Sequence, residues 1–142
     1  MTALQTVIDK NATLTDGSRA AGDYDNSSAQ DNEGIAYLEL QFDTGPPSAG
    51  AVIASMWLLP GDGEVSESFP EGGDGTVGTD DDPQPSFLIA VFTTINPSTS
   101  VNEVAGSLPF YLYPATNRFV IRNDSGQTYD ATWELRIKPY RR

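Results

Sequence analysis

The sequence predicts one all-β domain, a two-sheet β-sandwich of jelly-roll type. Three observations lead to this prediction: apolar and polar residues alternate with a period of two, turn-forming residues separate the alternating runs, and no window carries an apolar stripe at helical spacing. Seven or eight short strands arranged in this way are typical of a sandwich or a jelly roll. The 142 residues fit a single domain over 1–142, and no break in composition divides them.

The N-terminal third contains two weak strand candidates and one strong candidate. Residues 4–8 and 12–15 are short runs with some apolar character, and residues 1–20 are a candidate N-terminal arm. Residues 35–43 alternate cleanly, as in a strand with one face on the core and the other in water. We expect the core-facing side chains here to be Leu38, Leu40 and Phe42.

Two further segments, 51–59 and 87–95, are apolar on both faces. A strand of this kind is either central and covered on both sides, or it has one face against another subunit. The candidate residues for such a subunit interface are Ile53, Trp57, Leu88 and Phe92.

The C-terminal third predicts an edge strand and a hairpin. Residues 108–113 are aromatic and carry a proline near their start, which an edge strand tolerates. Residues 118–123 and 132–138 alternate again, and the Asn, Asp, Ser and Gly of 123–128 between them are turn formers. We expect these two strands to pair with each other. Their buried side chains should be Phe119, Ile121, Trp133, Leu135 and Ile137.

Residues 61–85 predict one long acidic loop. The segment holds eight of the twenty acidic residues of the chain and no Lys or Arg. A loop of this length in a compact domain is usually functional or disordered. Because its charges repel those of a second copy, we expect it to point into solvent and away from any subunit contact.

Charge and composition exclude several classes of function. Eight basic and twenty acidic residues give a formal net charge of −12, which repels phosphate groups, so we expect neither nucleic acid nor a membrane as partner. The chain has no His and no Cys, which excludes Ser-His-Asp and Cys-His catalysis and the usual zinc ligands. We therefore expect no enzymatic activity and no cofactor. The first residues do not resemble a signal peptide, so we expect a chain made inside the cell.

The basic residues are concentrated near the C-terminus, where the last quarter of the chain carries six of the eight. On paired hairpin strands, Arg118, Arg122, Arg136 and Lys138 would share one face. A solvated strand face is the commoner meaning of such a pattern, and a docking patch for an acidic partner is the alternative. The candidate docking residues are Arg136, Lys138, Arg141 and Arg142.

Matches to ligand-binding motifs fail in their context. Residues 73–78 read G-x-G-x-x-G, but no strand precedes them and three aspartates follow where a helix should open. Residues 23–34 begin like a calcium loop, but Ser28 replaces the turn glycine and Gly34 replaces the bidentate glutamate. No spacing supports a cation at residues 80–82, and we expect no metal site.

The two tryptophans could in principle stack on sugars. Trp133 is in phase with the inward residues of its strand, which favours a place in the core, whereas the strand of Trp57 has no obvious wet face.

The order of segments resembles a family of small virion proteins of tailed phages and prophages. The resemblance covers residues 20–140 and rests on the order of its pieces rather than on one motif. The matching pieces are Tyr24-Asp-Asn26, 35–42, Leu58-Leu-Pro60, 87–94, Leu108-Pro-Phe110, 123–128 and Ile137-Lys-Pro-Tyr140.

This resemblance implies a β-sandwich decoration (cement) protein on the outer capsid surface, which braces the shell by non-covalent contacts. The implied partners are the major capsid protein and further copies of the chain, with a homotrimer expected, and assembly would occur in the host cytoplasm. The basic residues Arg136, Lys138, Arg141 and Arg142 then become candidate capsid contacts. The alternative is a carbohydrate- or receptor-binding module of a phage tail or adsorption apparatus, for which exposed aromatic residues would be the sign.

Overall fold

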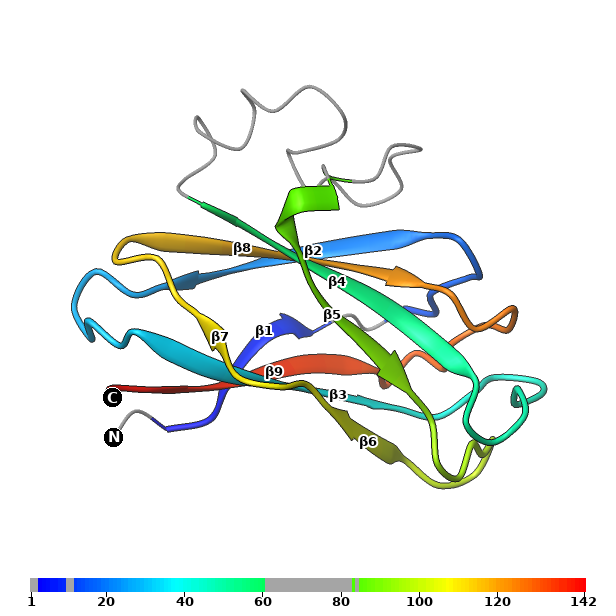
Figure 1. The fold of residues 1–142 in the computed structure, drawn as a ribbon. Coiled ribbons are helices and arrows are strands. Elements are labelled where there is room, and N and C mark those ends of the chain that lie inside the picture. The colour runs from blue at the N-terminus through cyan, green and yellow to red at the C-terminus, as the bar shows by residue number, and fades with distance from the viewer. Residues whose placement is uncertain (1–2, 10–11, 61–82, 84) are drawn as a thin grey trace.

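A computed structural model describes residues 3–9, 12–60, 83 and 85–142, and over these residues the chain is a sandwich of two antiparallel sheets (Figure 1). One sheet, here the β3 sheet, has the strand order β1-β9-β3-β6, with β7 also paired to β3; the other, here the β4 sheet, has the order β2-β8-β4-β5. The elements are β1 (Gln5–Asp9), β2 (Arg19–Asp25), β3 (Glu33–Leu40), β4 (Val52–Pro60), the short 3-10 helix η1 (Pro85–Phe87), β5 (Leu88–Thr93), β6 (Glu103–Gly106), β7 (Phe110–Tyr111), β8 (Thr116–Asn123) and β9 (Glu134–Tyr140).

The strand order confirms the predicted all-β sandwich. With β7 set aside, successive strands alternate between the sheets except at the β4–β5 hairpin, as in a jelly roll, which is a double-sheet fold of eight strands. In the part of the chain that is described, no helix has the length and apolar character needed to cross a bilayer.

The core lies between the two sheets and contains the side chains that the alternation predicts. All eight predicted core residues are buried: Leu38, Leu40, Phe42, Phe119, Ile121, Trp133, Leu135 and Ile137. Trp133 packs edge-to-face on Tyr129, with ring centroids 5.8 Å apart, and its indole N–H donates to the Ala12 carbonyl at 3.2 Å. The prediction that Trp133 is a core residue is therefore confirmed.

Strand β4 is covered on both faces, which is one of the two arrangements its composition predicts. Its inward side chains, among them Ile53 and Met56, belong to the main core. On the outer face of the sheet, Trp57 and Leu59 form a smaller buried cluster with Val120, against which Phe87 packs. The guanidinium of Arg122 lies 5.2 Å from the centre of the Trp57 ring, a cation–π arrangement.

The predicted C-terminal hairpin is wrong. Strand β8 pairs with β2 and β4, whereas β9 pairs with β1 and β3 in the other sheet. Residues 124–133 therefore carry the chain from one sheet to the other. Turn-forming residues serve this crossing as well as a tight turn, so local sequence does not distinguish the two. As a result Arg118 and Arg122 lie on one sheet and Arg136 and Lys138 on the other, and the shared basic face does not exist.

Two strands were not predicted. Strand β2 contains Gly22 and three charged residues, and β6 has four residues, so neither carries a clear alternation. In the N-terminal region, β1 pairs with β9 and Leu14 forms a bridge to Tyr129, so these residues are part of the sandwich rather than a free arm.

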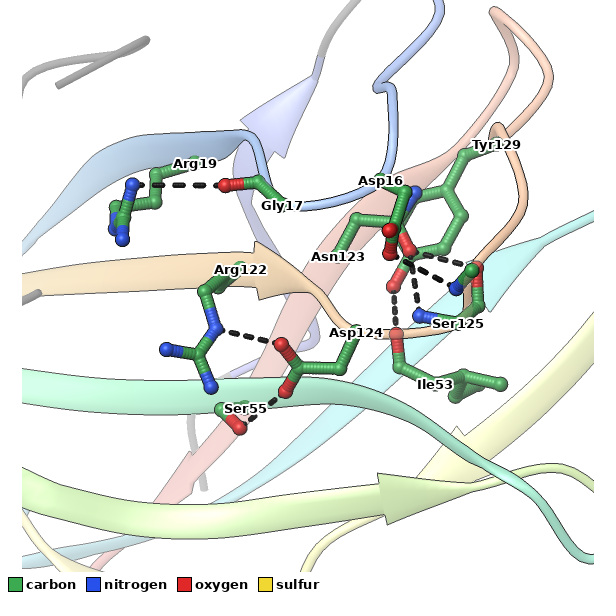
Figure 2. Close-up of polar contacts among 11 residues, drawn as sticks. Asp16, Gly17, Arg19, Ile53, Ser55, Arg122, Asn123, Asp124, Ser125 and Tyr129 are labelled. Atoms are coloured by element: carbon green, nitrogen blue, oxygen red, sulfur yellow. Dashed lines mark hydrogen bonds and ion pairs between the residues drawn. The ribbon is translucent and has the colours of Figure 1, made fainter. Parts of the chain in front are cut away.

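Buried asparagines hold the loops between strands. Asn123 donates through its side-chain amide to the carbonyls of Leu14 (2.8 Å) and Gln127 (2.7 Å), and its amide oxygen accepts from the Ser125 N–H at 2.9 Å. Gly126, at φ +75°, lets the chain turn here, and its N–H donates to Asp16 at 2.8 Å. Figure 2 shows this cluster beside Tyr129. The segment 123–128 thus fastens the N-terminal residues 14–17 to the corner between the sheets.

Candidate functional site

A pocket of about 340 Å³ opens at one end of the sandwich. It lies where the end of β4, helix η1 and the start of β5 face the segment that contains β7. Its lining residues are Leu58, Ser86, Phe87, Ile89 and the run Phe110–Tyr113. We call this the aromatic pocket.

One wall of the aromatic pocket is fixed by two further buried asparagines. The amide oxygen of Asn117 accepts from the Tyr113 N–H at 2.8 Å, and the Asn117 amide donates back to the Tyr113 carbonyl at 3.0 Å. Asn26 donates to the same carbonyl at 2.9 Å and to the Asp31 carbonyl at 2.6 Å. Asn26 is part of the Tyr24-Asp-Asn26 motif, so that motif positions the pocket wall.

The chemistry of the aromatic pocket is apolar with few polar groups. Phe110 is buried and packs edge-to-face on Phe119 at 5.8 Å, whereas Tyr111 is 76% exposed. The polar side chains in the lining are the hydroxyls of Ser86, Tyr111 and Tyr113, and none of the described lining residues is charged. Such a surface can hold an aliphatic or aromatic side chain or the apolar face of a sugar.

A second hollow of about 290 Å³ continues along the same side of the molecule. It lies between β5 and the segment after β6, and it shares Ile89 with the aromatic pocket. Its other lining residues are Ala90, Val91, Gly106, Ser107 and Leu108. We call this side, from η1 along β5 and β6 to β7, the open edge of the sandwich.

Sequence reasoning missed the open edge, although a signal was present. Residues 83–117 contain a single charged residue, Glu103, in a chain where one residue in five is charged. That carboxylate accepts hydrogen bonds from the Thr94 hydroxyl and from the N–H groups of Ile95 and Asn96. The one charge of the segment is thus used to hold the end of β5 to β6.

Three of the four predicted basic docking residues, Arg136, Arg141 and Arg142, are engaged within the chain. Arg136 pairs with Glu39 at 2.8 Å and with Glu134 at 3.2 Å, on the outer face of the β3 sheet. Burial raises the pKa of Glu134; Arg136 opposes that shift and the neighbouring Glu39 adds to it. These contacts reduce the net positive field that an acidic partner would meet.

The remaining three basic residues are spread along the end of β9 and beyond. Arg142 pairs with Glu33 at 2.9 Å, and Arg141 donates to the Ala29 carbonyl at 2.6 Å. Lys138 lines a shallow apolar hollow with Leu4 and Val104. Their role as capsid contacts stays a prediction.

The four predicted subunit-interface residues occupy different environments. Ile53 and Phe92 are in the core between the sheets, and Trp57 is buried in the outer cluster. A single chain thus accounts for the apolar character of these three without a second subunit. Leu88 is 41% exposed and lies on the open edge.

The polar cluster of Figure 2 is structural. Arg122 pairs with Asp124, the Ser55 hydroxyl donates to the same carboxylate, and the Tyr129 hydroxyl donates to the Ile53 carbonyl. Burial, with smaller contributions from Asp124 and Asp16, raises the pKa of Tyr129 well above its usual value.

Of the remaining ligand motifs, the described residues include only the calcium-like segment. Asp23 of the calcium-like segment lies in β2 and pairs with Arg118 at 2.9 Å. Within the described ranges, no three His, Cys, Asp or Glu residues gather as metal ligands would. The G-x-G-x-x-G match at 73–78, the aspartates at 80–82 and nearly all of the acidic segment 61–85 lie outside the described residues.

Comparisons with known proteins give no family for this chain. No protein-family model matches the sequence, and no curated protein matches it. Among solved structures, a carbohydrate binding module (CBM6cm-2) from Cellvibrio mixtus lichenase 5A, in complex with cellotriose, is similar with a TM-score of 0.37 and 11% identity. The alignment covers 96% of this chain and 95% of that one.

Proposed function

We propose that this protein is a non-catalytic structural component of a tailed-phage virion, a decoration protein that binds the outer shell of the capsid by non-covalent contacts. The proposal starts from the order of segments that resembles small phage virion proteins. It is compatible with the jelly roll, a fold that viral capsid domains and lectins share, although a fold by itself does not define a function.

The observation that carries the proposal is the open edge. On this side of a strongly acidic protein the described residues include one charge, Glu103, and exposed apolar side chains, with Leu108 83% exposed and Tyr111 76% exposed. Exposed apolar surface of this kind is typical of sites where proteins bind one another. One piece of the resemblance, Tyr24-Asp-Asn26, also bears on this side of the molecule, because Asn26 holds one wall of the aromatic pocket in place.

The test is to ask where the protein is found. An antibody raised against the recombinant chain is used on phage particles purified, by density gradient, from cells that carry the coding sequence. We expect the protein to band with the particles and gold-labelled antibody to decorate the heads. Absence from washed particles would contradict a virion role, and label confined to tails would contradict the decoration role.

A second candidate function is carbohydrate or receptor binding, which the aromatic pocket favours. Phe87, Tyr111 and Tyr113 line it, and an exposed tyrosine can stack on a sugar ring. The test is affinity electrophoresis against a panel of soluble glycans. Under this function, Tyr111→Ala abolishes retardation and Tyr37→Ala, which removes a tyrosine on the outer face of the β3 sheet, does not. No retardation of the wild-type chain by any glycan would count against it.

A further inference from the structure

The edge strands on the two sides of the sandwich differ in whether a neighbouring strand and charged residues protect them. On one side, β1 and β2 pack against each other, and both carry charged residues. On the open edge, β5 ends the β4 sheet and β6 ends the β3 sheet (Figure 1). Glu103 of β6 joins the two through its hydrogen bond with Thr94, and a hollow lies between β5 and the segment after β6. In the described part of the chain, no strand pairs with the outer side of β5.

Strand β5 lacks the features that normally protect an edge. In natural proteins, charged side chains, above all lysine, or prolines on an edge strand prevent it from pairing with another chain. Residues Leu88–Thr93 contain none of these, so no backbone N–H is missing from the strand. Because β5 already pairs with β4 on one side, alternate residues direct their N–H groups to the free side. By contrast, β2 on the opposite side carries Arg19, Asp23 and Asp25.

We propose that β5 pairs with β5 of a second copy of this chain, antiparallel across a two-fold axis, so that the two β4 sheets join into one continuous sheet. Two identical strands in antiparallel register satisfy each other's free backbone groups, which is the self-complementarity that a two-fold contact requires. Such an addition to an exposed edge obtains its affinity from main-chain hydrogen bonds.

The distribution of charge favours a second copy of the chain as the partner of β5. Each copy carries a net charge of −12, so two copies repel each other over most of their surfaces. Among the described residues, the open edge carries little negative charge, because residues 83–117 contribute a single carboxylate that is already hydrogen-bonded. A partner recognised through its own charges would find no complementary group there.

The exposed apolar area is also near what an interface needs. Six large apolar side chains are exposed between residues 88 and 111, apart from Val104, which faces the hollow beside Lys138. At on the order of 150 Å² for a fully exposed side chain, they present on the order of 600 Å² together, against about 800 Å² per partner in a standard interface. These residues are Leu88, Val91, Ile95, Val101, Leu108 and Tyr111.

This pairing does not depend on the proposed virion role, and it differs from the trimer that the resemblance implies. A two-fold axis beside β5 pairs the β5 edge of one copy with the β5 edge of the other, so the assembly stops at two copies. A trimer would require each copy to offer two different surfaces.

The experiment measures mass by light scattering after size-exclusion chromatography, from 1 to 100 µM of the wild-type chain and two variants. Val91→Lys introduces a charge in the middle of β5, at a side chain that is 52% exposed. Thr6→Lys introduces the same charge at an exposed position on β1, on the opposite side. We expect twice 15.3 kDa for the wild type and for Thr6→Lys, and at least a tenfold weaker association for Val91→Lys.

Far-UV circular dichroism checks that Val91→Lys keeps the fold. If it does not, hydrogen exchange of the wild type at 1 and 100 µM takes its place, and the amides of residues 88–93 should be protected more at the higher concentration. The proposal is overturned by a wild-type monomer at 100 µM, by a mass of three copies, by equal loss of association in the two variants, or by exchange at 88–93 that does not depend on concentration.

Discussion

Gly22 of β2 lies directly against the backbone of Val7 in β1: a Cβ at position 22 would come within 1.8 Å of the Val7 carbonyl oxygen. The same Cβ would meet the Ile8 side chain at 2.9 Å. The two strands belong to different sheets, so this contact brings the sheets together on the side opposite the open edge. The absence of a side chain at Gly22 permits that approach.

Gly22→Ala should therefore destabilise the protein by about 3 kcal/mol, the upper part of the range for overpacking, because the backbone of β1 has to move. Gly106→Ala is the control, since its Cβ would meet the Tyr37 ring at an ordinary 3.7 Å. Urea unfolding followed by tryptophan fluorescence measures both. Equal stability of the two variants would mean that the backbone of β1 moves away from the added methyl group at little cost in free energy.

Asn123→Ala should cost about 2–3 kcal/mol, because it removes three hydrogen bonds: those that the side-chain amide donates to the carbonyls of Leu14 and Gln127, and the one that its oxygen accepts from the Ser125 N–H. Asn102→Ala, at an exposed position, should change stability by less than about 0.5 kcal/mol. The same urea titration compares them. A loss below about 1 kcal/mol for Asn123→Ala would show that water replaces the missing amide.

Tyr129 predicts a loss of stability in alkali. Burial raises its pKa in the folded protein above its usual value of 10.0, so above that pH the unfolded chain gives up this proton more readily than the folded chain. The folded state therefore binds more protons, and the free energy of unfolding falls as pH rises above 10. Tyr129→Phe removes this titration and should flatten the slope between pH 9 and 11.5, while lowering stability at pH 7 through the lost hydrogen bond to Ile53. Parallel slopes for both proteins would contradict the assignment.

Arg136→Gln should destabilise the protein by about 1 kcal/mol at pH 7, because Glu39 and Glu134 then face each other without their shared cation. The pKa of Glu134 is already raised, and losing Arg136 raises it further. Acidification protonates Glu134 and removes the repulsion, so the difference from wild type should shrink toward pH 4. Thermal unfolding at pH 7 and pH 4 measures this change, and a difference that grows on acidification would refute the explanation.

Alternation along the chain was enough to determine which side chains of the regular strands are buried. In β3 and β9, each inward residue is set by the two-residue period of a strand, and the period depends only on backbone geometry. Leu38 and Leu135 are therefore buried whichever strands they pair with. The all-β class follows from the same local property.

Strand partners, in contrast, were decided by the tertiary structure. Residues 118–123 and 132–138 have the expected phase, yet they belong to opposite sheets, because the buried Asn123 and Tyr129 direct the chain across the core rather than back on itself. Pairing is a contact between segments distant in sequence, and turn-forming residues permit either route.

The same division applies to the candidate site. The sequence by itself determined that residues 83–117 are nearly free of charge, since that is a matter of composition. Only the tertiary structure put β5 and β6 at sheet edges on one side and aligned Phe87, Ile89 and Tyr111 around one pocket. An uncharged apolar segment can equally fill a core, as Phe92 does, and whether it is covered depends on which strands end each sheet.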